Sequence, residues 1–308
     1  MANSDPDVAV VGHFAIDSII LPSRSKPFVV VGGAVTYVSL ETRKLDGSVS
    51  VISKVGEDFP EAYMWWLKEE GVDLTGVAKV ANEQTTRFEL EYNADLSSRN
   101  LKLKSKAPAI VLEDLPSCLH AKAIHLGPIA GEIPFEVVEH LKGCSGILSL
   151  DPQGLTRCFD ENGNVTCNKQ VDPRVMGLVN IYKSSFEEIK TVTGQSDLSQ
   201  AIKAVHDLGP ETVIATLGGK GAALSVQGTL YNIPACASEK VVDPTGAGDV
   251  FMGAFLTEYT RQKDSLWCAC VGSAAASLVV EAVGPTFFGE KEEIYRRANV
   301  IYEKEIKQ

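Results

Sequence analysis

Short apolar runs and amphipathic stretches alternate along most of the chain. The run from Asp7 to Gly12 is β-branched and bounded by glycine, which is typical of a buried strand. After Gly33, apolar residues recur at helical spacing as far as Leu45, and Gly47 stands where a C-terminal cap is expected. The same patterns predict further strands at 48–55, 123–126, 146–150, 180–183 and 212–217, and helices at 60–70, 266–282 and 290–306. Strands that alternate with helices indicate a mainly parallel sheet with helices on both faces.

Residues 83–106 break this alternation. Segments 85–92 and 100–104 alternate apolar and polar residues around a turn-like stretch at 93–99, which predicts a half-exposed hairpin. A hairpin inserted in an α/β chain does not easily join a buried parallel sheet. We therefore expect it to project as a small separate sheet that forms a lid.

Composition and charge narrow the class of protein. The chain of 308 residues is 44% hydrophobic and 22% charged, as in ordinary globular proteins. Its apolar stretches are far shorter than the roughly 20 residues that span a bilayer. Residues 1–7 are acidic and lack the basic and apolar regions of a signal peptide, so we expect a cytoplasmic protein without a membrane segment. A net charge of -11 argues against nucleic acid as the main partner.

The cysteines and histidines show neither a disulfide framework nor a metal motif. The seven cysteines are an odd number, and Cys268 and Cys270 are closer in sequence than the ligand pairs of zinc sites. The five histidines also lack the spacing of a zinc motif. We therefore expect these side chains to be structural.

The strongest local signal is the loop from Asp243 to Phe251, which leads into an apolar helical pattern. Gly246, Ala247 and Gly248 have almost no side chain, and their N–H groups stand where a helix leaves its first amides unpaired. These amides form a predicted anion site. Asp249 beside them is a candidate catalytic base.

A simpler interpretation is that the glycines make a turn and Asp249 caps the helix, which is the commoner outcome for an isolated Gly-x-Gly. The loop is not a Walker loop, because no Gly-Lys-Ser/Thr follows it. Phe251 also occupies the place of the third glycine in the dinucleotide fingerprint. A dehydrogenase is therefore disfavoured, although the sheet pattern alone is compatible with one.

Several segments together resemble the PfkB family of carbohydrate kinases, also called the ribokinase family. They are the C-terminal signature at 243–249, the diglycine Gly32-Gly33, the segments 54–58 and 69–73, and the nucleotide-loop segment 216–221. The resemblance covers almost the whole chain and implies a ribokinase-like three-layer α/β/α fold with a mainly parallel central sheet and a small β-sheet lid. It implies one kinase domain over residues 1–308, in which 13–31 and 83–106 form the lid. ATP would lie across the carboxyl ends of the strands with an essential Mg²⁺.

The same resemblance implies roles for individual residues. Asp249 would accept the hydroxyl proton while the amides of residues 246–248 stabilise charge. Residues implied beside the nucleotide are Ser185, Thr216, Gly218, Gly221, Thr245, Gly246 and Gly248, and those implied beside the substrate are Asp17, Gly32, Gly33 and Thr36. Glu188 and Asp243 are the candidate metal residues, and some family members bind K⁺ near the loop of Asp243 and Thr245. For Asp17, the alternative is a plain turn residue.

Two positions depart from the family pattern. The family usually has an asparagine after the diglycine, where this chain has Thr36 and Tyr37. A contact typical of ribose and fructose kinases is therefore missing. The Asn-x-x-Glu motif of the family appears here as Ser185 to Glu188, which keeps the glutamate and loses the amide. Catalysis can survive this change, because Mg²⁺ usually keeps several waters and needs few direct ligands.

Three segments, 33–37, 150–154 and 183–185, look like those of the inositol kinase branch of the family. They favour a polyol substrate, with myo-inositol first, and Gln153 and Arg157 would then face the active site instead of forming a surface loop. The alternatives are a nucleoside or sugar-acid kinase of the same family, or a nucleotide-binding sensor that has lost turnover. We expect a monomer or a homodimer paired through the lid, because exposed β edges invite pairing.

Overall fold

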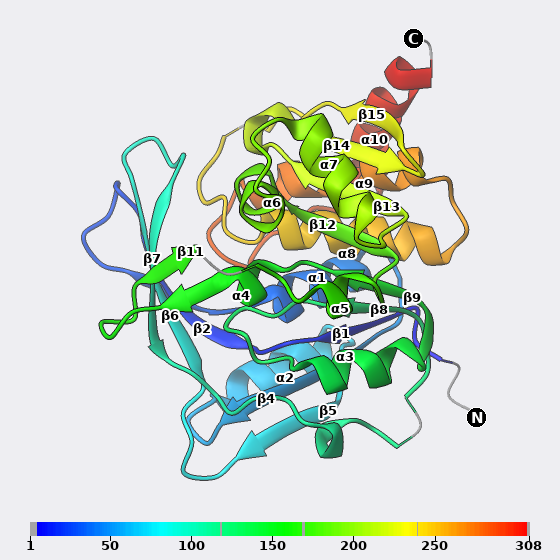
Figure 1. Cartoon of the computed structure of the whole chain (residues 1–308). Helices are drawn as coiled ribbons and strands as arrows, with labels where there is room; N and C mark the ends of the chain where they lie inside the picture. Colours follow the sequence, from blue (N-terminus) through cyan, green and yellow to red (C-terminus); the bar gives the residue numbers. More distant parts are fainter. Residues whose placement is uncertain (1–4, 118, 168–169, 239, 307–308) are drawn as a thin grey trace.

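The computed structural model describes residues 5–117, 119–167, 170–238 and 240–306. Its largest sheet has the strand order β15-β14-β13-β12-β9-β8-β1-β4-β5 (Figure 1). These strands are β1 (Val8–Val11), β4 (Val49–Gly56), β5 (Asp73–Val80), β8 (Ala121–Leu126), β9 (Ser145–Leu150), β12 (Ile181–Ser185), β13 (Thr212–Thr216), β14 (Ala222–Val226) and β15 (Thr229–Ile233). All pairings from β13 to β5 are parallel, whereas β14 and β15 add antiparallel strands at one edge. The predicted mainly parallel sheet is confirmed.

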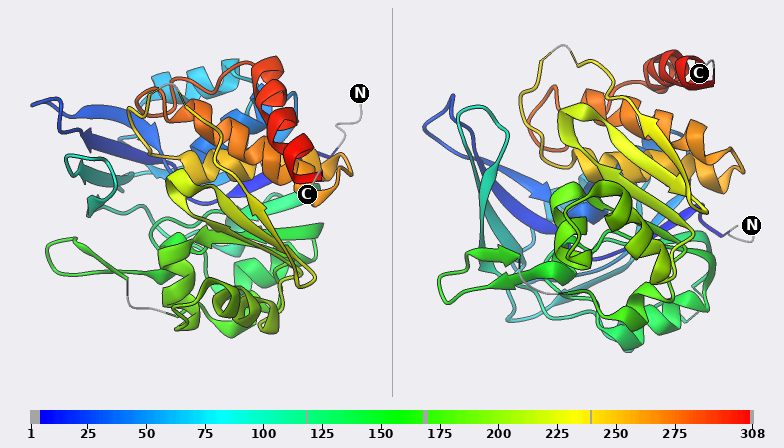
Figure 2. Two further views of the ribbon diagram at one scale, coloured as in Figure 1. Left: turned by 90° about the horizontal axis from the view of Figure 1, so that it is seen from above. Right: turned by 45° about the horizontal axis from the view of Figure 1, so that its top comes forward.

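Helices cover both faces of this sheet (Figure 2). One face carries α1 (Ala34–Lys44), α2 (Glu61–Glu69), α8 (Ala247–Thr260), α9 (Ser265–Val279) and α10 (Lys291–Ile306), and the other carries α3 (Phe135–Lys142), α5 (Pro173–Met176), α6 (Phe186–Thr193) and α7 (Leu198–Asp207). The buried strand β1 shows why. Val8 and Val10 belong to the hydrophobic core under α1, α8 and α9, and Ala9 and Val11 belong to the core on the opposite face, under α3 and α6. Two buried faces make the α/β/α layering the favourable arrangement. In the described ranges, no helix combines the length and apolar character of a membrane span.

The lid is a separate sheet with the order β3-β2-β6-β7, seen at the left of Figure 1. Its strands are β2 (Ala15–Ile20), β3 (Phe28–Gly32), β6 (Thr86–Tyr92) and β7 (Arg99–Ser105). β6 and β7 pair antiparallel, as the alternating pattern of 85–104 predicted. One face of the lid has a core of its own, in which Ile19, Phe88 and Leu90 pack against Ile129. A short hairpin of β10 (Arg157–Phe159) and β11 (Val165–Cys167) was not predicted and bridges to the lid between Lys102 and Asn164.

The end of α1 lies where the sequence predicts it and differs in one detail. The helix ends at Lys44, and Asp46 rather than Gly47 adopts a left-handed backbone, with φ 58°. Aspartate tolerates this conformation better than most side chains do. Gly47 is needed for another reason: a Cβ there would lie 2.7 Å from the side chain of Thr42, and the Gly47 amide donates to the Thr42 carbonyl at 2.8 Å.

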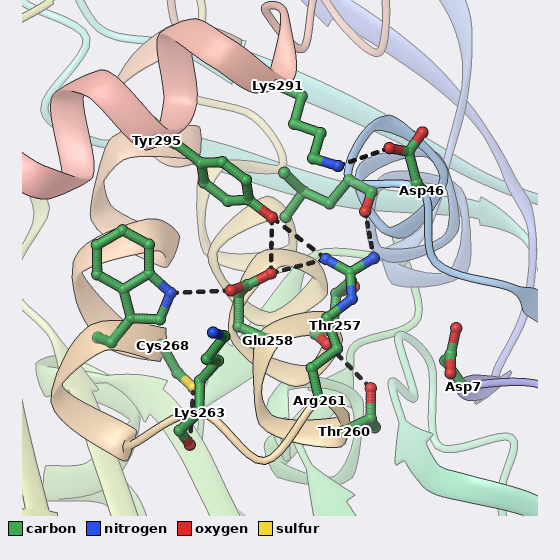
Figure 3. Close-up of polar contacts among 12 residues, drawn as sticks. Asp7, Asp46, Thr257, Glu258, Thr260, Arg261, Lys263, Cys268, Lys291 and Tyr295 are labelled. Atoms are coloured by element: carbon green, nitrogen blue, oxygen red, sulfur yellow. Dashed lines mark hydrogen bonds and ion pairs between the residues drawn. The ribbon is translucent and has the colours of Figure 1, made fainter.

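A buried carboxylate fixes the C-terminal helix to the body (Figure 3). Glu258, at the end of α8, accepts hydrogen bonds from the Arg261 guanidinium, the Tyr295 hydroxyl and the Trp267 indole, each at 2.8 Å. Arg261 also donates to the carbonyl of Leu45. Helices α1, α8, α9 and α10 therefore meet at one satisfied charge, which makes this network a stability element of the fold.

Candidate active site

Functional side chains collect at the carboxyl ends of the parallel strands, where open α/β sheets bind ligands. The chain leaves β1 into the lid, β9 into the short helix α4 (Gln153–Thr156), and β12 into α6. The segment after β13 turns through Gly218 and Gly221, both with positive φ. Two cavities lie at this edge, one on each side of the first turn of α8.

The first turn of α8 is built as the loop motif predicts. Gly246 has φ 78°, and a Cβ on it would overlap the ring of Tyr37, so no other residue fits there without a shift. The amide of Ala247 makes a long hydrogen bond of 3.3 Å to the carbonyl of Pro244. The amides of Gly246 and Gly248 have no acceptor among the described residues. Two of the three proposed anion-binding amides are thus free to bind a ligand.

Asp249 lies in this first turn and lines the cavity under the lid. The Gln153 amide donates to its Oδ1 at 3.3 Å. Burial raises the pKa of Asp249 to about 6; Lys183 acts against this rise and Asp151 adds to it. A carboxylate with this pKa is still ionised near neutral pH and is a stronger base than an exposed aspartate.

Lys183 and Asp151 form a buried ion pair beside the same turn. The Lys183 Nζ lies 2.6 Å from Asp151 Oδ2, and both side chains are almost completely buried. A Cβ on Gly248 would lie 2.5 Å from that Nζ, so the ammonium group stands directly against Gly248. Burial lowers the pKa of Lys183, but Asp151 and Asp249 outweigh it and hold the pKa above its ordinary value. The sequence analysis gave neither residue a role of its own.

The cavity under the lid has a volume of about 50 Å³ and lies between lid and body. Asp17, Gly33, Gln153, Arg157, Thr245 and Asp249 line it, as do Tyr37 and Arg99. Asp17 is buried against Gly32, and its Oδ1 has no hydrogen-bond partner among the described residues. Burial raises the pKa of Asp17 to about 7, against the influence of Arg99 and Arg157. An unpartnered buried oxygen of this kind calls for a hydrogen-bond donor from a ligand.

Arg157 and Gln153 hold each other in place on this cavity wall. Arg157 donates to the Gln153 side-chain oxygen at 2.6 Å and to the Ile129 carbonyl at 2.9 Å. Both line the cavity under the lid rather than forming a surface loop. Thr36 behaves differently from Tyr37: its hydroxyl donates to the Gly32 carbonyl at 2.6 Å, and it does not line the cavity. Tyr37 does, and its hydroxyl has no partner among the described residues.

The second cavity, of about 240 Å³, lies on the other side of Gly248. Small residues make most of its walls, including Thr216, Gly218, Gly221, Ala247 and Gly248, and Val241, Phe251 and Val280 supply its apolar surface. Flat apolar walls of this size suit a nucleotide base, and the amides at the helix start suit its phosphates. Of the residues predicted beside the nucleotide, Thr216, Gly218, Gly221 and Gly248 are thus brought to one place, and Gly246, which precedes α8, lines the lid cavity instead. Thr245 also lines the lid cavity. Ser185 lines neither cavity.

Ser185 and Glu188 form a capping box at the start of α6. Glu188 Oε2 accepts from the Ser185 amide at 2.8 Å and from its hydroxyl at 2.7 Å. The serine that replaces the family asparagine therefore orients the glutamate. Asp243 binds backbone only, accepting from the amides of Thr245 and Gly284, each at 2.9 Å. Within the described ranges, no three His, Cys, Asp or Glu side chains form a ready metal site.

The site combines a helix start with free amides, a buried lysine and a carboxylate at a cavity, and these are the parts that phosphoryl transfer to a hydroxyl requires. The match to a family model agrees: residues 5–292 match the pfkB family of carbohydrate kinases. The chain belongs to this family, and it is a phosphotransferase with an alcohol group as acceptor.

Known relatives differ in the acceptor that their names give. A cytidine kinase of Thermococcus kodakarensis is 27% identical over 283 residues, which are 90% of this chain and 97% of the relative. An inositol 3-kinase of Arabidopsis thaliana is 26% identical over 302 residues, which are 94% of this chain and 80% of the relative. A pyrophosphate-dependent kinase in the ribokinase family, solved with a pyrophosphate analog and myo-inositol, superposes with a TM-score of 0.80 at 21% identity and covers 94% of this chain and 99% of its own. This last likeness establishes the ribokinase-like fold.

Proposed function

We propose that the protein transfers the γ-phosphate of ATP to a hydroxyl of a compact polyol, with myo-inositol as the best candidate. The observation that carries the proposal is the position of Asp249. Its carboxylate lines the cavity under the lid, which we call the acceptor cavity, together with Asp17. Asp249 also belongs to the same helical turn as the free amide of Gly248. A base, an acceptor site and an anion site thus meet within one turn of α8.

The arrangement divides the chemistry among the side chains. Asp17 accepts a hydrogen bond from an acceptor hydroxyl through its unpartnered Oδ1. Asp249 takes the proton of the attacking hydroxyl as the new O–P bond forms. The Gly248 amide and the Lys183 ammonium stabilise the negative charge on the transferred phosphoryl group. Asp151 keeps Lys183 protonated and in place.

The donor is proposed to be ATP, because the 240 Å³ cavity beside Gly248 provides a place for a base that pyrophosphate does not need. Mg²⁺ would supply charge neutralisation on the phosphates when bound. Glu188 is the candidate that would hold it through water, since its carboxylate is oriented by Ser185 and Mg²⁺ usually keeps several waters. Asp243 is proposed to shape the loop for a monovalent cation such as K⁺, because both of its oxygens bind backbone amides.

The acceptor is proposed to be compact because the lid cavity is small. Its 50 Å³ has room for only a few water molecules, so every proposed acceptor requires some displacement of the lid, and a small ring of hydroxyls requires less than a nucleoside does. The nucleoside alternative stands on the name of the cytidine kinase relative. It requires the lid to close less far than it does in this structure.

The test is ADP release from ATP with myo-inositol, other polyols, sugars, sugar acids and cytidine as acceptors. We expect the highest kcat/KM for a polyol and no turnover by Asp249→Asn. A clear preference for cytidine would replace the polyol proposal with the nucleoside kinase. No acceptor-dependent ADP at all would favour the nucleotide-binding sensor.

The proposed partners are this small acceptor and, for oligomerisation, a second copy through the lid. The edge strand β3 leaves Val29 59% exposed. An apolar edge of this kind favours pairing. Sedimentation equilibrium of the protein and of Val29→Lys tests this, with a dimer expected only for the former. The cytoplasmic location stays a prediction from the sequence.

A further inference from the structure

One hydrogen bond joins the lid to the loop in front of α8. The hydroxyl of Tyr92, the last residue of β6, lies 2.7 Å from the Thr245 Oγ1, and both side chains are buried. Arg99, the first residue of β7, donates to the Tyr92 oxygen at 2.9 Å. Either hydroxyl can be the donor in the bond between Tyr92 and Thr245. The contact links two segments that are 153 residues apart in the sequence.

Thr245 is in turn part of the rigid approach to the anion site. Its amide donates to Asp243 Oδ1 at 2.9 Å, and Asp243 Oδ2 accepts from the Gly284 amide at the same distance. Gly246 follows at once and begins α8. A displacement of Thr245 is therefore transmitted directly to the backbone that presents the free amides.

Two of the residues around this contact, Arg99 and Thr245, also line the acceptor cavity. Arg99 from the lid, Asp17 from the lid and Thr245 from the body all contribute to its wall. The lid cannot move away from this cavity without breaking the bond between Tyr92 and Thr245. The position of the lid over the acceptor and the position of the phosphate-binding loop are thus joined by one contact.

We propose that Tyr92 is a positioning residue that makes the phosphate-binding loop depend on lid closure over the acceptor. The inference rests on the proposed kinase function and adds a residue that has no place in the loop motif. Without the contact, the lid still binds the acceptor, but Thr245 and the following amides are held less well for phosphoryl transfer. Coupling of this kind is the logic of induced fit, in which the correct substrate completes the catalytic site.

The experiment is the Tyr92→Phe variant, which removes the hydroxyl and keeps the ring. We expect kcat to fall about tenfold or more, the effect of leaving one buried hydroxyl without its partner, with a smaller change in the KM for the acceptor. Tyr231→Phe is the matched control. Tyr231 is 37% exposed on β15, and its hydroxyl makes no hydrogen bond to a described residue, so its kcat should equal that of the wild type.

Two further measurements separate positioning from a general structural defect. Thr245→Val and the double variant with Tyr92→Phe form a cycle, in which the double variant should be no slower than Thr245→Val alone. Trypsin cleavage within the lid, at Arg99, Lys102 and Lys104, should be faster in Tyr92→Phe than in the wild type, and this readout needs no turnover. Thermal unfolding of both phenylalanine variants checks that each is folded.

An unchanged kcat for Tyr92→Phe, or effects of the two single variants that multiply in the double variant, would overturn the proposal. Unchanged trypsin cleavage of the lid would do the same. These outcomes differ from a failure of the proposed function, which would show as a wild-type protein that phosphorylates no acceptor. The proteolysis result remains informative in that case as well.

Discussion

Replacing Asp249 by asparagine should abolish turnover and make the protein more stable. The substitution removes a negative charge from the cavity wall while the size of the side chain stays nearly the same. A positioned base typically contributes about 10² to 10⁴ in rate, so we expect a loss of at least about a hundredfold in kcat. The gain in stability has a separate origin, which is the cost of keeping this carboxylate ionised in the folded protein.

The pKa of Asp249 sets the size and sign of that gain. Burial raises it from 3.8 to about 6, which corresponds to at most about 3 kcal/mol of differential stability. Because the pKa is higher in the folded state than in the unfolded chain, folding is favoured by protonation. The burial of Asp249 therefore lowers the free energy of unfolding of the wild type by this full amount above about pH 6, and not at all below about pH 3.8. Asparagine resembles the protonated form, so its advantage should grow between pH 4 and pH 8.

Two assays measure these effects. Acceptor-dependent ADP release gives kcat/KM against pH, and for the wild type it should fall as Asp17 and then Asp249 are protonated, to about one tenth of its plateau or less at pH 5. Urea unfolding at pH 4 and pH 8 gives the stability difference. Asp207→Asn is the matched control, because Asp207 is exposed at the end of α7 and makes no hydrogen bond to a described residue.

Three results would refute this reasoning. A variant that keeps more than a tenth of the wild-type kcat would show that Asp249 is not the base. A flat pH profile between pH 5 and pH 7 would show that another step or another group controls the rate. An asparagine variant less stable than the wild type at pH 8 would show that Lys183 and the amides of α8 more than compensate for the burial of the charge.

Three other substitutions test separate features. Glu258→Gln should lower the free energy of unfolding by about 3 kcal/mol, because it leaves the Arg261 guanidinium without its buried counter-charge. Urea titration measures this loss, and a value below about 1 kcal/mol would contradict the role of this network. Glu41→Met should raise the free energy of unfolding by about 1 kcal/mol, and by more at pH 8 than at pH 4. The reason is that the buried Glu41 carboxyl has no partner among the described residues, and burial raises its pKa well above the ordinary value. Equal urea midpoints of variant and wild type at pH 8 would refute this. Gly246→Ala should reduce kcat at least about a hundredfold, because the φ of Gly246 is 78° and a Cβ there would overlap the ring of Tyr37. Gly146→Ala is the control and should keep the wild-type rate, because nothing lies within 4 Å of the added Cβ.

Features that depend on nearby residues were predictable from the sequence. The loop before α8 combines glycines with the start of an apolar helix, and both signals lie within a few positions of Gly246. The hairpin of β6 and β7 follows from alternation on one exposed and one buried face. The end of α1 was predicted to within about one residue, and the Gly47 amide bonds the Thr42 carbonyl there, although Asp46 rather than the glycine takes the left-handed conformation.

Features that depend on strand order were not predictable. The edge strands β14 and β15 and the hairpin of β10 and β11 have short patterns that do not identify their partners. The contact of Tyr92 with Thr245 joins the lid to a loop far along the chain, and neither residue type signals the other. Tyr37 had no role of its own in the sequence predictions, although its ring packs against Gly246 and its hydroxyl has no partner among the described residues.

The pair of Asp151 and Lys183 shows what information was missing. Asp151 directly follows β9 and Lys183 lies within β12, so the local pattern at each residue indicates only a buried strand. In the sheet β9 and β12 are parallel neighbours with Leu150 opposite Tyr182, so the next residues, Asp151 and Lys183, stand side by side at the active edge. Two other strands separate them in the sequence, so only the strand order shows that they meet. Once they meet, the aspartate keeps the buried lysine charged beside Gly248, and we propose that this charge and the free amide of Gly248 together hold the transferring phosphoryl group.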